Sequence, residues 1–325
     1  MEQIAEKHKG LIGGMSKIYD ILIAMRYLSA SDVIRPPIDN QSLPFSQLRS
    51  LGYESEVLGL VQQLPALRSE VVWGFQEWGV ELLPRSKVVT YFSHPDDPDF
   101  LNDLLWGDFY KTDDPNEMKW LHPWMLKLTE CGQNGYGTSL IYNIRDQSII
   151  EWTQIGRKYW DDMPSRPAEE VLSEIAEKLE SLEWVPYYDS DDKAEAPLFQ
   201  RKLVEDPIVF QNIWSGGIRV PGEIAAAIEY LQSEHGDADW LRQSINRWRA
   251  LQMHYVDSRW ATGAWDADAF WEKRVAWIRE LHALERQRPH GAWSDNQKYL
   301  EHPMLPDWEN RHFDFFKQSA GDRAV

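Results

Sequence analysis

Hydrophobic residues change their spacing along the chain near residue 165. Just before this point, over 129–164, short apolar and β-branched runs are broken by Gly and polar residues, which is typical of β-strands and turns. After it, apolar residues recur every three or four positions with glutamates between them, which is typical of an amphipathic helix. The stretch 129–184 therefore predicts a β-hairpin followed by a helix, and the other segments are interpreted around it.

The hairpin is predicted over about 138–152. Residues 139–144 are mostly β-branched, aromatic or aliphatic, and 145–148 are polar and prone to form a turn. The apolar pattern then resumes at 149–152. Several glycines precede the first strand, and glycine adopts positive φ at little cost, so they indicate turns rather than a ligand-binding loop.

The helix is predicted over about 167–184, with Ser165 or a neighbour as its N-cap. Glutamates occupy the side opposite the apolar stripe, and those in the first turn suit the positive end of the helix dipole. The apolar stripe consists of Val171, Ile175, Leu179 and Leu182. Such a stripe must be buried, and we expect it to pack beside the adjacent hairpin.

The remaining segments complete an α+β prediction. Residues 1–69 are predicted as an N-terminal helical segment and 70–186 as the α+β core, with a strand candidate at 88–92. Residues 187–197 form a polar, acidic linker, and 198–325 a C-terminal helical region. The expected fold is a mixed or antiparallel sheet flanked by helices, with helical extensions at both ends.

Acidic residues dominate the charge of the chain. There are 34 Lys and Arg against 52 Asp and Glu, which gives a formal net charge of −18. Such a surface repels phosphate backbones and anionic membranes, so we expect no nucleic-acid or membrane partner. It attracts a basic protein partner, although acidic residues also serve solubility alone. The chain also contains 17 Trp, a residue common both in cores and at recognition surfaces.

A single cysteine, Cys131, excludes an internal disulfide and any cysteine-based zinc or iron–sulfur cluster. One cysteine suits a reducing compartment. The apolar run 18–28 contains Asp20 and Arg26 and is too short to span a bilayer, and no signal-peptide pattern is evident. These observations predict a soluble, cytoplasmic protein.

One motif resembles a metal site. The strand candidate followed by His94-Pro95-Asp96-Asp97 resembles the zinc site of the LmbE-like N-acetylglucosamine deacetylases. This resemblance implies His94 and Asp97 as ligands and Asp96 as base. However, Pro98 replaces an acidic residue of the family pattern, and no later H-x-D-H completes the ligand set. Because two ligands do not hold a catalytic zinc, we favour a Pro-rich acidic turn.

The order of elements around the hairpin resembles a second family. A Gly-containing turn, the strand SLIYNI, a polar turn, a strand ending at Trp152 and a helix closing on LESLEW resemble the latter half of SUKH-type, or fungal cell-wall-assembly-regulator, domains. The match covers roughly 60–185, and Leu64-Pro65 resembles an early segment of that family. The chain is also similar to filamentous-fungal proteins of the same layout. It departs from the family pattern in its N-terminal helices and its long C-terminal extension.

The SUKH-type resemblance implies non-enzymatic work, as a protein-interaction scaffold or as an immunity protein that neutralises a toxin. We therefore expect an intracellular module that binds a protein partner, with a basic protein as a candidate, through an acidic, aromatic-rich surface. The candidate binding residues lie around the hairpin: Tyr136, Tyr142, Glu151 and Trp152. Ordinary packing within the sheet is the alternative role for these four side chains.

An alternative from another class is a small-molecule-binding protein, or an enzyme of a biosynthetic pathway, with a Trp- and Tyr-lined pocket. In that case carboxylates would act as acid and base. No catalytic residue and no cofactor is assigned from the sequence, and the balance favours a protein that is not an enzyme. The oligomeric state is left open.

Overall fold

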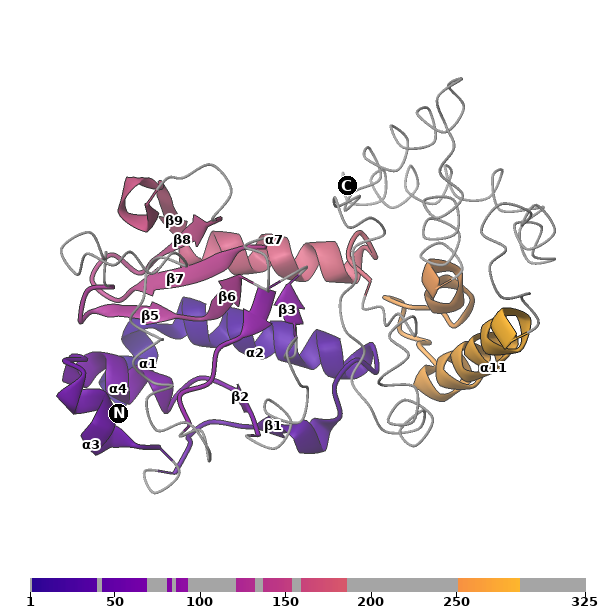
Figure 1. Cartoon of the computed structure of the whole chain (residues 1–325), viewed down its shortest axis with the longest axis horizontal. Helices are drawn as coiled ribbons and strands as arrows, with labels where there is room; N and C mark the ends of the chain where they lie inside the picture. Colours follow the sequence, from indigo (N-terminus) through magenta and orange to yellow (C-terminus); the bar gives the residue numbers. More distant parts are fainter. Residues whose placement is uncertain are drawn as a thin grey trace. The chain divides into compact units, whose positions relative to one another are not determined.

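The computed structural model describes residues 2–39, 43–68, 81–83, 86–92, 121–131, 137–153, 159–185 and 251–286. The chain divides into two compact units, Met1–Asn212 and Ile213–Val325. The first unit combines helices with antiparallel sheets, so the fold is α+β as predicted (Figure 1).

The hairpin lies within a four-stranded antiparallel sheet. Strand β7 (Ser139–Asn143) pairs with β8 (Ser148–Trp152), in a register that runs from Ser139 opposite Trp152 to Asn143 opposite Ser148. Strand β9 (Ser165–Pro167) pairs with β8, and β5 (Met125–Lys127) pairs with the other side of β7. The predicted hairpin is therefore present, and its strands lie between two edge strands.

A second antiparallel sheet continues from the first. Its strands, in spatial order, are β3 (Glu81–Leu83), β4 (Ser86–Val88) and β6 (Thr129–Cys131). Only Leu128 separates β5 from β6, and its N–H donates to the Leu140 carbonyl oxygen (2.7 Å). The Leu128 carbonyl oxygen accepts from the N–H of Val89 (3.3 Å). Leu128 therefore bonds both to β7 of the first sheet and to the residue that follows β4 of the second. The strand candidate at 88–92 was misplaced, because pairing ends at Val88.

Helices α2 (Lys9–Ala24) and α7 (Ala168–Glu180) run side by side (Figure 1). A Cβ atom on Gly14 would lie 2.7 Å from Cβ of Leu172, so glycine is needed for this close approach. The apolar stripe predicted for α7 is buried along this side. The helix ends at Glu180, earlier than predicted, and Leu182 lies beyond it with a φ of 60° but is still buried.

The N-cap prediction for α7 was wrong. Pro167 occupies the cap position and makes no side-chain hydrogen bond to the helix. Ser165 lies in β9, where it pairs with Ile150. Proline suits the start of a helix because its φ is already close to the helical value and the first N–H groups need no intrahelical acceptor.

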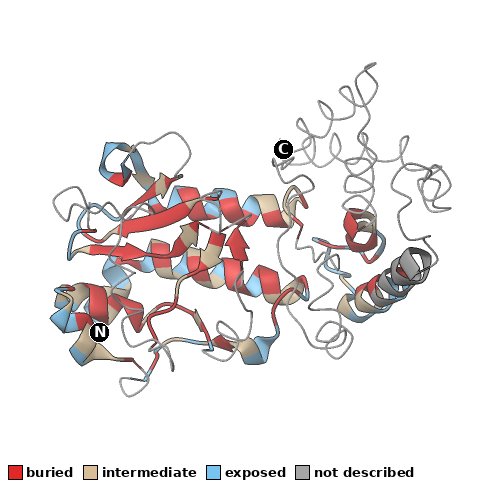
Figure 2. Ribbon diagram, viewed as in Figure 1, coloured by how far each residue is buried: buried red, intermediate tan, exposed pale blue. Residues whose placement is uncertain are grey.

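The sheet has a core on both faces. Successive residues of a strand point to opposite sides, so Ile141 and Tyr142 face different layers. Ile141 joins the cluster of Leu121, Met125, Ile150, Trp152 and Trp160, the last from η3 (Trp160–Asp162). Tyr142 contacts His8, between α1 (Glu2–Lys7) and α2. Figure 2 shows buried residues along these strands and the helices beside them.

The N-terminal part of this unit is not helical throughout. Besides α1 and α2 it contains α3 (Phe45–Ser50), α4 (Ser55–Val61) and η1 (Ala30–Asp32). It also contains a two-stranded sheet formed by β1 (Val33–Ile34) and β2 (Ala66–Leu67). Since α2 packs on α7, these elements belong to the same compact unit as the sheet.

In the second unit the described residues are mainly helical. Residues 251–257 are helical, and α11 spans Ala267–Arg286. Asp266 caps α11, because its Oδ1 accepts the N–H of Ala269 at 2.9 Å. Tyr255 stacks on Phe270 with ring centroids 4.1 Å apart, which ties the two helices together. Across both units, no helix in the described ranges is long and apolar enough to cross a membrane.

Candidate functional site

The candidate binding residues of the hairpin differ in burial and in the face of the sheet on which they lie. Tyr142 and Trp152 are both buried, with 1% and 5% of their surface exposed. They lie on opposite faces of the sheet, since Trp152 shares its face with Ile141. Glu151 is half-buried and shares a face with Tyr142. The three described candidates therefore do not meet on one surface.

Four further candidates, Tyr136, His94, Asp96 and Asp97, lie outside the described residues. Within the described ranges, no three His, Cys, Asp or Glu side chains come close enough to hold a metal ion. The zinc resemblance of the HPDD motif thus stays a prediction from the sequence.

Tyr142 takes part in a polar network with His8 and Glu56, which is buried at Tyr142 and His8 and half-buried at Glu56. The Tyr142 hydroxyl lies 2.7 Å from Nδ1 of His8, and Nε2 of His8 lies 2.9 Å from Oε1 of Glu56. The Glu56 carboxylate also accepts from Nζ of Lys7 at 2.5 Å, and this bond, with that of His8, lowers the pKa of Glu56. An ionised carboxylate only accepts, so Nε2 carries a proton, and Nδ1 of a neutral imidazole accepts from the phenol.

This network joins the α1–α2 junction, α4 and strand β7. The imidazole of His8 is fully enclosed, and burial, together with the charge of Glu56, raises the pKa of Tyr142. The phenol therefore stays protonated as a donor. Because it is enclosed, Tyr142 positions elements of the fold and does not offer its hydroxyl to a ligand at the surface.

Glu151 belongs to an ion-pair cluster centred on Arg166 of β9. The guanidinium of Arg166 contacts Oε2 of Glu151 at 3.1 Å, Oε1 of Glu170 at 2.7 Å and the carboxylate of Glu174. The bond from Arg166 lowers the pKa of Glu174, and the carboxylates raise that of Arg166. Arg166 was not among the candidate residues. Its spacing of four from Glu170 was the signal available in the sequence.

The cluster lies within a strongly acidic stretch. Residues 159–185 contain eight acidic and two basic side chains, a formal net charge of −6. The acidic residues are Asp161, Asp162, Glu169, Glu170, Glu174, Glu177, Glu180 and Glu183. Of the two basic residues, Arg166 donates hydrogen bonds to three carboxylates. The other, Lys178, has its Nζ 4.8 Å from the ring centroid of Trp184. We call the solvent side of α7, with Glu151 and Arg166, the acidic face.

A partly exposed aromatic stack lies near the turn of the hairpin, where Trp124 is half-buried against the core cluster and His122 is exposed. The ring of His122 stacks on Trp124 with centroids 4.4 Å apart, and Cζ of Arg145 lies 3.4 Å from the centroid of the Trp124 ring. Arg145 also pairs with Glu54 at 2.7 Å. Trp, Arg and Tyr are residue types that concentrate at protein–protein interfaces, and Tyr159, 37% exposed, is a further aromatic at the surface.

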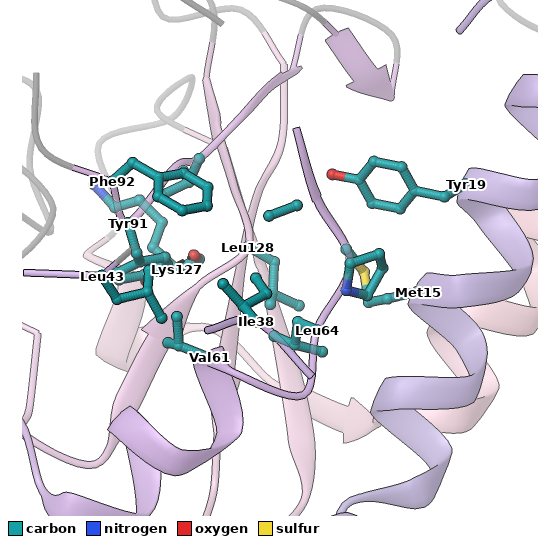
Figure 3. A pocket seen from close by; sticks show the side chains of 13 residues that line it. Met15, Tyr19, Ile38, Leu43, Val61, Leu64, Tyr91, Phe92, Lys127 and Leu128 are labelled. Carbon is teal, nitrogen blue, oxygen red and sulfur yellow. Dashed lines mark hydrogen bonds between the residues drawn. The ribbon is translucent and has the colours of Figure 1, made fainter. Parts of the chain in front are cut away.

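A small cavity lies between α2 and the strands (Figure 3). Its volume is about 40 Å³. Its lining is apolar apart from three residues, Tyr19, Tyr91 and Lys127. The Tyr91 hydroxyl donates to the Lys127 carbonyl oxygen at 2.9 Å, and Nζ of Lys127 lies 3.9 Å from the Glu130 carboxylate. None of the hairpin candidates lines this cavity.

The second unit contains a buried polar pair. His254 and Ser258 lie one helical turn apart, with 4% and 3% of their surface exposed. Neither Nε2 of His254 nor Oγ of Ser258 has a hydrogen-bond partner among the described residues. Burial lowers the pKa of His254 to about 4, opposed by Asp257 and reinforced by Lys273 and Arg274. His254 is therefore a neutral imidazole at neutral pH.

Comparisons of the chain with protein-family models, curated proteins and solved structures found no match. The SUKH-type resemblance therefore remains an expectation from the order of strands, turns and helix in the sequence. The function is inferred from the charge, burial and contacts of the chain's own residues.

Proposed function

We propose that this chain is a non-enzymatic protein-interaction module that binds a basic protein partner through its acidic face. The observation that carries this proposal is the net charge of −6 over residues 159–185. The arginine of this stretch already contacts three carboxylates. A concentrated field of one sign accelerates the approach of an oppositely charged partner and orients it. This is also the kind of role that the SUKH-type resemblance implies.

Several carboxylates of the acidic face are available to a partner. Glu169 and Glu177 are exposed, and neither lies within 4 Å of a basic side chain in the described part of the chain. By contrast, Glu180 pairs with Lys17 of α2 at 3.0 Å. Lys or Arg side chains of a partner can therefore reach Glu169 and Glu177 without breaking an ion pair of this chain.

Apolar contact area is also present along the same stretch of chain. Tyr159 is exposed and immediately precedes η3, whose Asp161 and Asp162 are exposed as well. Aromatic side chains usually supply the anchoring contacts of an interface, while surrounding charges set the approach and the specificity. The proposed partner is therefore a basic protein that also presents an apolar contact to Tyr159.

The experiment is affinity capture with the full chain, followed by binding measurements at about 50 and 300 mM salt. We expect a stoichiometric basic protein whose affinity falls as salt rises. The charge-reversal variant Glu169→Lys/Glu177→Lys should weaken binding about tenfold or more, since close interfacial charge pairs couple strongly.

The matched control is Glu2→Lys/Glu272→Lys, which changes the net charge equally at exposed positions outside the acidic face. It should have a much smaller effect. If both double variants weaken binding equally, or if binding does not depend on salt, the acidic face is not the binding surface.

The alternative of a small-molecule enzyme gains no support from the cavity in Figure 3. Its volume of about 40 Å³ is far below the roughly 300–1,000 Å³ of sites for drug-sized ligands. No carboxylate lines it, so a pair of acid and base groups does not converge there.

A further inference from the structure

We propose that the helix of residues 251–257 and α11 form an acid-sensitive contact, in which protonation of His254 releases the helix and exposes the aromatic side chains packed between the two. The inference starts from buried polar atoms in the second unit. It does not depend on the proposed function, because the acidic face belongs to the first unit.

Two buried polar atoms at this contact lack hydrogen bonds. Nε2 of His254 and Oγ of Ser258 are enclosed by protein atoms, and neither has a hydrogen-bond partner among the described residues. Buried polar groups nearly always have a partner, since an unsatisfied one has lost its hydrogen bonds to water without replacing them. Opening of the helix returns both groups to water. The two side chains therefore destabilise the closed contact relative to an open one.

The charges around His254 also oppose an imidazolium in the closed contact. In the described part of the chain it faces Asp257 on its own helix, and Lys273 and Arg274 on α11. Asp257 and Lys273 are exposed to solvent, whereas the cation Arg274 is buried. Burial is the main cause that lowers the pKa of His254 to about 4, and the two cations reinforce it. A proton therefore binds more tightly in the open state than in the closed one.

Aromatic packing holds the contact closed, and the turn beside it is strained. The ring of Tyr255 stacks on Phe270 with centroids 4.1 Å apart, and the ring of His254 meets Trp277 at 5.5 Å. The helix leads into a turn in which Arg259 has a φ of 65°, a conformation that is unfavourable for residues other than glycine. Opening allows this turn to relax. It also exposes Tyr255 and Phe270, which are fully buried in the closed contact.

The experiment is native-state hydrogen exchange of the full chain, corrected for the intrinsic exchange rate at each pH. Peptides from 251–258 should open about thirtyfold more often at about pH 5 than at about pH 8, given a pKa of 6.5 in the open state and about 4 in the closed state. A low concentration of urea should hardly change their exchange, because a local opening exposes little surface. It should accelerate the exchange of α11 peptides more strongly.

Two variants separate the contributions of the two side chains. His254→Phe keeps a ring beside Trp277 but cannot take up a proton, so opening should no longer depend on pH. Ser258→Ala removes the hydroxyl that has no described partner, so opening should fall severalfold at every pH while its dependence on pH stays. Ser173→Ala, at an exposed position of α7 in the first unit, is the matched control and should change neither quantity.

Three results would overturn the proposal. The first is equal opening of the 251–258 peptides at both pH values, and the second is a dependence on pH that survives in His254→Phe. The third is urea acceleration as strong as that of the α11 peptides, which would mean that the unit unfolds as a whole. Should His254→Phe fail to fold, Ser258→Ala still decides the question, since unchanged opening in that variant also refutes the role of the unsatisfied atoms.

Discussion

Substituting Tyr142 by Phe tests whether the Tyr142–His8–Glu56 network stabilises the first unit. The change removes one hydroxyl and leaves Nδ1 of His8, in a side chain 1% exposed, without its partner at 2.7 Å. A buried acceptor left without a hydrogen bond costs about 1–3 kcal/mol. The edge-to-face contact of the two rings, with centroids 5.7 Å apart, is kept by Phe. We therefore expect a loss of about 2 kcal/mol in unfolding free energy.

The assay has to separate the two units, because a single denaturation curve would combine their transitions. Native-state hydrogen exchange, followed on peptides from β7 and β8, reports the opening free energy of the sheet directly. Tyr159→Phe is the matched control, since the same hydroxyl is removed from a side chain that is 37% exposed. It should change the opening free energy by less than about 0.5 kcal/mol.

A double-mutant cycle with His8→Phe sharpens this prediction. Replacing both hydrogen-bonded partners by apolar rings leaves no orphaned atom between them, so the double variant should lose less than the two single losses combined. We expect a coupling energy of at least about 1 kcal/mol. Additive losses, or a Tyr142→Phe effect no larger than that of Tyr159→Phe, would refute the role assigned to the network.

Three further outcomes follow from other parts of the structure. The pKa of His254 is lowered from 6.5 to about 4, so its unfolded state takes up a proton first as pH falls. The second unit should therefore lose up to about 3 kcal/mol of unfolding free energy as the pH falls from about 6.5 to 4. Hydrogen exchange of peptides in 251–286 measures this loss, and His254→Gln should make the unfolding free energy less dependent on pH. Gly14→Ala should destabilise the first unit by about 1–3 kcal/mol in the same assay, because the added Cβ atom would clash with Leu172. Gly13→Ala is the control, since a Cβ atom there would have no other atom within 4 Å, and it should be neutral or slightly stabilising. Arg166→Gln should leave the stability of the first unit nearly unchanged, because exposed ion pairs contribute little. It should strengthen binding of the proposed basic partner, measured by titration, since three carboxylates lose their competing cation; weaker binding would count against the acidic face.

Local patterns in the sequence were enough to predict the hairpin but not the role of its side chains. The runs of β-branched, aromatic and aliphatic residues and the polar turn at 145–148 depend only on neighbouring residues, and the strands form where they were expected. The burial of Tyr142 depends on His8, which is 134 positions away in the sequence. A spacing rule carries no information about a contact of that separation.

For α7, local spacing in the sequence predicted the buried side of the helix, whereas tertiary contacts decided where the helix begins and ends. Its apolar stripe was predicted from spacing alone, and its described members are buried. Ser165 has the chemistry of an N-cap but is held in β9 by pairing with Ile150, so tertiary pairing overrode a local preference. Leu182 keeps the spacing of the stripe after the helix has ended, since its positive φ turns the chain while its side chain stays buried.

The acidic residues of α7 can be tested for a purpose beyond solubility. Glu177 has Glu174 and Glu180 three positions away on either side, so three like charges lie along one surface of the helix. Like-charge neighbours at this spacing cost about 0.2–0.5 kcal/mol per pair. Glu177→Gln should therefore stabilise the first unit slightly, by less than about 0.5 kcal/mol in hydrogen exchange of α7 peptides, since Glu174 and Glu180 are already paired with Arg166 and Lys17.

The same substitution should weaken binding of the basic partner severalfold, because it removes an exposed carboxylate that no described basic side chain engages. Solubility requires only that charge be spread over the surface, and does not require a helix to bear this repulsion. Opposite signs for stability and binding therefore indicate charge retained for recognition. A Glu177→Gln variant that gains stability and binds as before would assign these glutamates to solubility alone.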